Sequence, residues 1–216
     1  MAKYLGSVCK LCRREGEKLF LKGSRCFGNK CPVEGKARKP GQHGTPIGAG
    51  GGRRSKQSEY ALRLREKQKA KRIAGLTEAQ FYNYFKKASK MKGLTGLNLI
   101  YLLSMRLDNV VYLLGLAPSR RAARELVTHG HYKVNGKKIT APGYNLSPGD
   151  KIVPSAKLLS ETSGIPAARE DYSVSPPAWL SYDKSAHTGS VVSAPAKEQT
   201  PYAGINEQYI VELYSK

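Results

Sequence analysis

The sequence predicts an α+β fold: a mostly helical domain, a small αβ domain built from a helix-turn-helix and a short hairpin or sheet, and an N-terminal segment tied together by cysteines. Three observations predict it. Two short helical patterns and an Asn-Gly hairpin follow one another between residues 106 and 153. Helical patterns rich in lysine and aromatic residues precede them, between residues 58 and 103. All four cysteines lie within the first 31 residues. Helices and strands are thus segregated along the chain.

The composition indicates a folded protein with a polyanionic partner. A chain of 216 residues, 40% of them hydrophobic, can form one or two domains with real cores. Its formal net charge is +21, from 37 Lys and Arg against 16 Asp and Glu, and such an excess is typical of proteins that bind nucleic acid. The most apolar run, residues 97–103, is too short to span a bilayer. We expect a cytoplasmic protein without a membrane partner.

The cysteine spacing predicts a metal site. Cys9 and Cys12 are separated by two residues, Cys26 and Cys31 by four, and thirteen residues separate the pairs. Two such pairs can place four thiolates around one structural zinc ion with no open position for water. Disulfides and free thiols are the alternatives, and the first is disfavoured because no secretory signal precedes the cysteines.

A basic arm is predicted to follow. Residues 36–72 contain twelve Lys or Arg and only two acids. The first half is rich in glycine and has no apolar period, so it is predicted to be extended. If it folds against nucleic acid, Arg53, Arg54 and Lys56 are candidate phosphate contacts. A disordered, solvated arm is the alternative.

Three helices are predicted next. Residues 58–74 form a helix loaded with Lys and Arg. Thr77 begins the second, because Gln80 completes a capping box with it. Its apolar stripe begins at Phe81, and core packing is favoured over base stacking for its aromatic residues. Residues 95–103 form the third helix.

Residues 106–128 predict two short helices joined by a turn. Asp108 or Asn109 is expected to cap the first helix, and Ser119 the second. The second helix carries Arg120, Arg121 and Arg124 near its N-terminus, where the helix dipole disfavours cations. A docked phosphate would remove this conflict, so we interpret the helix end as a phosphate site. A solvated basic face is the alternative.

A hairpin and a further strand complete this unit. Residues 131–134 and 137–140 flank Asn135-Gly136, a pair that supplies the positive φ angles of a type I′ turn. Residues 151–153 are predicted to return as a strand. Beyond them, residues 158–170 predict a broken helix, 176–180 an extended piece with one buried aromatic, 185–201 a loop, and 206–214 a final strand or a docked extended segment.

The order Arg106-Leu107-Asp108, Ser119-Arg120-Arg121 and Val134-Asn135-Gly136 resembles the small S4 RNA-binding module. That module also occurs in pseudouridine synthases, tyrosyl-tRNA synthetases and a heat-shock ribosome-binding protein. Nearly the whole chain is similar to the bacterial family of small-subunit ribosomal protein four in its zinc-binding, cysteine-bearing form. The similarity rests on the cysteine set and on residues 40–44, 106–111 and 210–216.

The resemblance implies two domains. Residues 1–95, completed by about 196–216, would form the zinc knot, arm and helical domain, and residues 96–195 a second domain containing the module at about 106–153. It also implies a structural constituent of the small ribosomal subunit that binds a multi-helix junction in the 5′ domain of small-subunit rRNA. The family nucleates assembly, lies beside small-subunit protein five near the site where mRNA enters, and contributes to translational accuracy.

On this interpretation the protein is not an enzyme and has no small-molecule substrate. A ribosome-rescue or heat-shock RNA-binding factor with the same module is the alternative, and an RNA-modifying enzyme is disfavoured because few acids are available for catalysis. The mechanism expected is a charge clamp that holds repelling phosphates together. The candidate RNA contacts are Arg53, Arg54, Lys56, Arg63, Arg65, Arg106, Ser119, Arg120, Arg121, Arg124, Lys133, Lys137 and Lys138.

Overall fold

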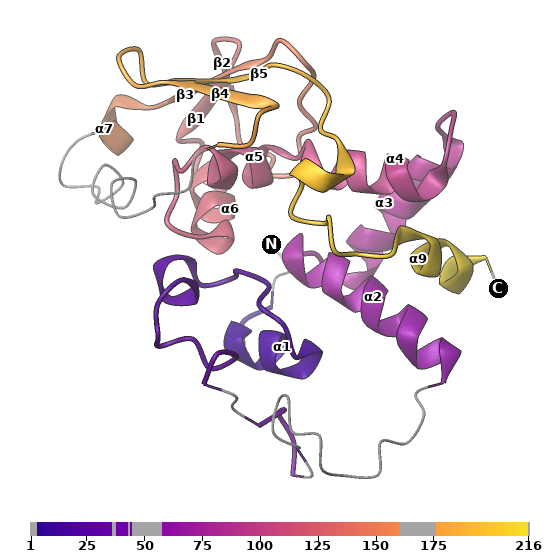
Figure 1. Ribbon diagram of the computed structural model, residues 1–216. Coiled ribbons are helices and arrows are strands. Elements are labelled where there is room, and N and C mark those ends of the chain that lie inside the picture. The colour runs from indigo at the N-terminus through magenta and orange to yellow at the C-terminus, as the bar shows by residue number, and fades with distance from the viewer. Residues whose placement is uncertain (1–3, 36–37, 43, 45–57, 160–175, 216) are drawn as a thin grey trace. The chain divides into compact units, whose positions relative to one another are not determined.

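The computed structural model describes residues 4–35, 38–42, 44, 58–159 and 176–215 (Figure 1). The chain forms two compact units. Unit 1 comprises Met1–Leu97 and Gly204–Lys216, and unit 2 comprises Asn98–Ala203. The chain therefore leaves unit 1, forms unit 2 and returns to unit 1. The units divide after residues 97 and 203, whereas the sequence predicted divisions after residues 95 and 195.

Unit 1 is helical. Its elements are α1 (Val8–Glu15), the 3-10 helix η1 (Gly23–Cys26), α2 (Glu59–Ile73), α3 (Glu78–Lys90), the start of α4 (Thr95–Ser104) and α9 (Glu207–Tyr214). Ser58 caps α2 by accepting from the backbone N–H of Ala61. Thr77 and Gln80 form the capping box at the start of α3, so the predicted starts of both helices are confirmed.

The C-terminal segment is a helix, so the prediction of a strand or extended piece there was wrong. Asn206 caps α9 by accepting from the backbone N–H of Gln208 at 3.1 Å. The sequence of this segment alternates well enough for a strand, and a helix of eight residues is not stable alone. Packing along α2 decides the outcome, and Figure 1 shows the two helices side by side.

Polar contacts fasten α9 to α2 and α3. The Tyr214 hydroxyl donates to Glu78 at 2.8 Å, and the same carboxylate accepts from Lys67 at 2.6 Å and from Lys71 at 2.8 Å. Although burial opposes the shift, these donors lower the pKa of Glu78 from 4.5 to about 2. The ring of Tyr214 packs 4.7 Å from that of Phe85. The chain's end is thus held by both aromatic and charged contacts.

Unit 2 packs several helices and a sheet around one core. Its helices are the rest of α4, α5 (Leu107–Leu113), α6 (Arg120–Thr128), α7 (Ala156–Leu159) and the 3-10 helix η3 (Lys197–Gln199). Its strands are β1 (Tyr132–Val134), β2 (Lys137–Ile139), β3 (Lys151–Pro154), β4 (Leu180–Asp183) and β5 (Thr188–Val191). They form an antiparallel sheet in the order β2-β1-β3-β5-β4, and α5 and α6 lie on one side of it (Figure 1).

The predicted hairpin and the third strand are confirmed. Asn135 and Gly136 adopt φ angles of 49° and 80° between β1 and β2, as a type I′ turn requires. Trp179 is fully buried in the core with Val110, Tyr132 and Ile152. The buried aromatic expected in residues 176–180 is therefore also confirmed.

The β4–β5 hairpin was missed, because the prediction assigned residues 185–201 to a loop. β5 has little apolar pattern, yet it pairs with β3 through Ile152 opposite Gly189. A Cβ at Gly189 would lie 2.4 Å from a methyl group of Leu114, so the strand approaches α5 as closely as glycine allows. Of the broken helix predicted over 158–170, α7 covers the start, and residues 160–175 lie outside the described part of the chain.

Candidate nucleic-acid interface

The corner between α5 and α6 is built on a buried carboxylate. The predicted cap by Asp108 or Asn109 was wrong, because the N-cap is Arg106 and Asp108 lies in the first turn. The guanidinium of Arg106 donates to both carboxylate oxygens of Asp108, at 3.0 and 2.6 Å. A nitrogen of Arg124 from α6 lies 3.9 Å from the same carboxylate. One acid therefore joins two arginines from two helices.

These two arginines are placed to support the corner. Arg106 is 2% exposed and Arg124 7%, so neither presents its charge to solvent. Their assignment as RNA contacts stays a prediction, and the geometry gives them a positioning task. The signal was available in the sequence, since Asp108 stands two residues after Arg106 and can close a local bidentate pair.

The N-terminus of α6 combines a cap with two arginines. Ser119 accepts from the backbone N–H of Ala122 at 3.2 Å, which confirms the predicted cap. Arg120 donates to the side-chain oxygen of Asn109, and its guanidinium carbon lies 4.6 Å from the ring centre of Tyr112. Arg121 is exposed, and its weak pair with Glu125 spans 3.6 Å. No acid lies in the first turn.

The β1–β2 hairpin presents three exposed lysines. Lys133 lies directly opposite Lys138 in the antiparallel register, and Lys137 faces Val134. Like charges at directly opposed positions repel one another. The side chain of Lys138 also lies across Gly130, where an added Cβ would be 2.1 Å from its ε-carbon. Repulsion at this pair would be relieved by an anion bound between the two ammonium groups.

The predicted contacts on α2 are engaged within unit 1. Arg63 pairs with Glu212 at 2.6 Å and with Glu59 at 3.0 Å. Arg65 lies 3.4 Å from Glu15. Both assignments as RNA contacts stay predictions, while Arg53, Arg54 and Lys56 lie outside the described residues.

Glu15 links α1 to α2 from a fully enclosed position. Its side chain has no exposed area, and it pairs with Arg72 as well as with Arg65. Burial raises the pKa of Glu15 and lowers that of Arg72, and each partner's charge opposes the shift. Since α1 also carries Cys9 and Cys12, this carboxylate fastens the cysteine-bearing helix to the basic helix.

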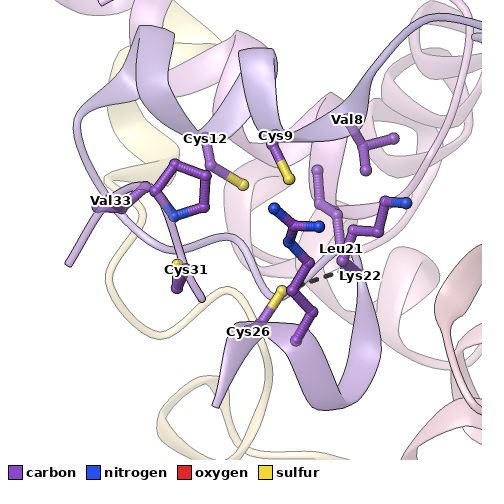
Figure 2. Close-up of a pocket in the computed structure, with 10 residues that line it drawn as sticks. Val8, Cys9, Cys12, Leu21, Lys22, Cys26, Cys31 and Val33 are labelled. Carbon is purple, nitrogen blue, oxygen red and sulfur yellow. Dashed lines mark hydrogen bonds between the residues drawn. The ribbon is translucent and has the colours of Figure 1, made fainter. Parts of the chain in front are cut away.

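All four cysteines line one pocket (Figure 2). Cys9 and Cys12 come from α1, Cys26 ends η1, and Cys31 follows in the next loop. The backbone N–H of Lys22 donates to the sulfur of Cys26 at 3.2 Å. Gly16 lets α1 end after the cysteines, because it adopts φ 80°.

The thiols are close enough to influence one another. Burial raises the pKa of Cys12, and the neighbouring cysteines raise it further; burial is also the main cause of the raised pKa of Cys26. Within the described ranges, no group of three or more Cys, His, Asp or Glu side chains has the arrangement that holds a metal ion. The four cysteines are free thiols that share this pocket.

Two models of known protein families match consecutive parts of this chain. Residues 3–104 match the ribosomal protein S4/S9 N-terminal domain, and residues 105–152 match the S4 domain. Small ribosomal subunit protein uS4 of Endomicrobium trichonymphae is 54% identical over 218 residues. Those of Acetivibrio thermocellus and Natranaerobius thermophilus are 50% and 49% identical over the same length. Each comparison covers 100% of both chains.

The fold and the site define an S4-domain protein of the ribosomal class. The similarity to these relatives extends over their complete length, and about half of the aligned residues are identical. The chain belongs to the uS4 family of small ribosomal subunit proteins. Among the helices described, none is both long enough and apolar enough to cross a membrane.

Proposed function

We propose that this chain is a constituent of the small ribosomal subunit that binds rRNA through its S4 module. The observation that carries the proposal is the hairpin pair Lys133 and Lys138, which are exposed and directly opposed. An isolated protein gains nothing from this arrangement, since the two charges repel. A phosphate between them converts the repulsion into two favourable contacts. Membership of the uS4 family supports rRNA as the source of that phosphate.

The proposed binding is a charge clamp on backbone phosphates. Arg121 at the start of α6 adds its charge to those of the hairpin lysines. The buried Arg106–Asp108–Arg124 group joins α5 to α6 and so fixes the helix that carries Arg121. We further propose the 5′ domain of small-subunit rRNA as the target, with small-subunit protein five and the site where mRNA enters as neighbours. These finer assignments, with roles in assembly and translational accuracy, rest on the family resemblance.

Binding to the 5′ domain is expected to be tight, selective and strongly salt-dependent. Displacing counterions from phosphates makes the logarithm of affinity fall linearly with the logarithm of salt, by about 0.7–0.9 per contact. A filter-binding titration at several salt concentrations, with tRNA and large-subunit rRNA as competitors, measures both properties. Lys133→Gln with Lys138→Gln should flatten the slope by roughly one to two, whereas Lys184→Gln, which removes one exposed charge outside the module, is the control and should leave the slope unchanged. A flat salt response contradicts the clamp.

We also propose that Cys9, Cys12, Cys26 and Cys31 hold one structural zinc ion. Four thiols on a single pocket are the donor set that zinc prefers in closed sites, and the bond from Lys22 N–H to Cys26 is of the kind that steadies a thiolate. When bound, the ion would tie α1 to the loop from η1 to Cys31. Binding would also remove the repulsion among neighbouring thiolates, which adds to the effect of burial in raising the pKa of Cys12.

Metal analysis of the reduced, purified chain is expected to find about one zinc per molecule. Changing Cys9 and Cys12 together to serine should abolish it, because two of four ligands are lost. Ser7→Ala, at the N-cap of α1, is the control and should keep the metal, because the Ser7 side chain makes no capping bond. Four titratable thiols and no metal in the unaltered chain would refute the zinc site.

A further inference from the structure

Two outward-facing phenyl rings bracket the loop that carries Cys26. The ring centres of Phe20 and Phe27 lie 5.2 Å apart, with an angle of 34° between the rings. Phe20 is 38% exposed and Phe27 52%, whereas Leu19 and Leu21 are buried. Apolar burial is therefore available on both sides of Phe20, and yet its ring lies at the surface beside that of Phe27.

The backbone at Phe20 is strained. Its φ is 50°, a region that bulky side chains rarely adopt. In the described part of the chain, the other residues besides glycine with positive φ are Asn135 and His187, types that tolerate it better. Strained conformations are concentrated at ligand sites, where the surroundings hold them in place. The fold alone would be served better by asparagine or glycine at this position.

The surroundings of the pair are basic and open. Lys22 and Arg25 are exposed between the two rings in sequence, and Lys30 follows three residues after Phe27. A Cβ placed on Gly28 would meet nothing within 4 Å, so space lies beside the Phe27 segment. Exposed aromatic rings interleaved with cations are the features by which proteins hold unpaired nucleotides, with the base on the ring and the phosphates on the cations.

We propose that Phe20 and Phe27 form a stacking site for an unpaired base of small-subunit rRNA, with Lys22 and Arg25 at the flanking phosphates. This inference rests on the proposed function and adds a second RNA contact of a different kind. The hairpin lysines act on backbone charge, whereas the phenyl pair acts on a base. The cysteine-bearing loop thus serves as the scaffold that keeps both rings outward.

The test uses the full chain under reducing conditions and the 5′ domain of small-subunit rRNA as the probe. Phe20→Asn and Phe27→Leu are each expected to weaken binding about fivefold to a hundredfold, the range of one base–aromatic stack. The salt slope should stay unchanged because no charge is removed, whereas Lys22→Gln should lower it by roughly one. Phe27→Tyr keeps the ring and should bind as the unaltered chain does.

Chemical probing of the bound RNA identifies the base directly. The unaltered chain should protect one unpaired nucleotide that becomes reactive again with Phe20→Asn and with Phe27→Leu, at the same position. Phe20→Asn should also melt at the same or a higher temperature with the same metal content, because asparagine relieves the backbone strain. If the ring of Phe20 served only the fold, the result would be the opposite. The variant would then melt at a lower temperature and lose its metal whenever it lost RNA binding.

The outcomes separate this inference from the proposed function. If the unaltered chain binds the 5′ domain selectively and both variants bind equally well, the stacking site is wrong and the proposed function stands. If the unaltered chain shows no preference for this RNA, both are overturned. Loss of affinity with unchanged melting, unchanged salt slope and one newly reactive base supports the stacking site.

Discussion

Replacing Asp108 by asparagine is expected to destabilise unit 2 by about 3–5 kcal/mol, the usual cost of removing one partner from a buried ion pair. Asp108 is 6% exposed, and it is the acid on which Arg106 and Arg124 converge. Asparagine has nearly the same shape but no charge. Two buried guanidinium groups would then lose the negative charge on which they converge.

Thermal and urea unfolding of the purified variant measure this effect. A domain of about 100 residues loses roughly 4–8 °C of Tm for each kcal/mol, so the shift should be large. The control is Glu125→Gln, because Glu125 and Arg121 form an exposed pair at 3.6 Å. Exposed pairs contribute about 0–1 kcal/mol, so this variant should unfold almost as the unaltered chain does. Equal stability of the two variants would contradict the structural part given to Asp108.

Elements with a local chemical signal could be predicted from the sequence. The Thr77–Gln80 capping box, the Ser119 cap and the Asn135-Gly136 turn each depend on residues within four positions of one another. Each of these signals can be recognised without knowing any tertiary contact. The starts of α3 and α6 and the β1–β2 hairpin therefore match the prediction.

Elements that depend on distant partners could not be predicted. β5 has almost no strand pattern, and its pairing follows from β3 and from the approach of Gly189 to Leu114. α9 alternates like a strand, and its helical form follows from packing on α2. Pattern alone does not contain these contacts, since they join residues far apart in the chain.

The residues of the candidate site also fall into two groups: those with a local signal in the sequence and those whose environment depends on the fold. Charge and turn chemistry indicated the lysines of the β1–β2 hairpin, and the structure presents them at the surface. Charge alone did not separate them from Arg106 and Arg124, which are equally basic but enclosed with Asp108. Arg106 has an acid two residues away in the sequence, whereas Arg124 reaches the same acid only through the fold. Lys133 has another lysine opposite it. The charges around each cation in the folded chain are thus the better guide to which cations serve an external anion.

Changing Ile210 to alanine is expected to destabilise unit 1 by about 2–5 kcal/mol, as for other buried isoleucines. Ile210 is fully buried and α9 has only eight residues. So short a helix does not persist in water without tertiary packing. Losing the isoleucine should therefore release the helix from α2, and the contacts of Tyr214 with Glu78 and Phe85 should be lost with it.

Hydrogen exchange, read residue by residue, tests this release. In the unaltered chain the amides of α9 should be protected, and in Ile210→Ala they should exchange at rates near those of an unfolded peptide, before the amides of α3 do. Gln208→Ala is the matched control, because Gln208 is exposed on the same helix and alanine favours helix formation. Protection that survives in Ile210→Ala would mean that the charged contacts of Glu78 and Glu212 hold the helix by themselves. Burial of Ile210 would then be incidental to how the chain's end is fastened to its beginning.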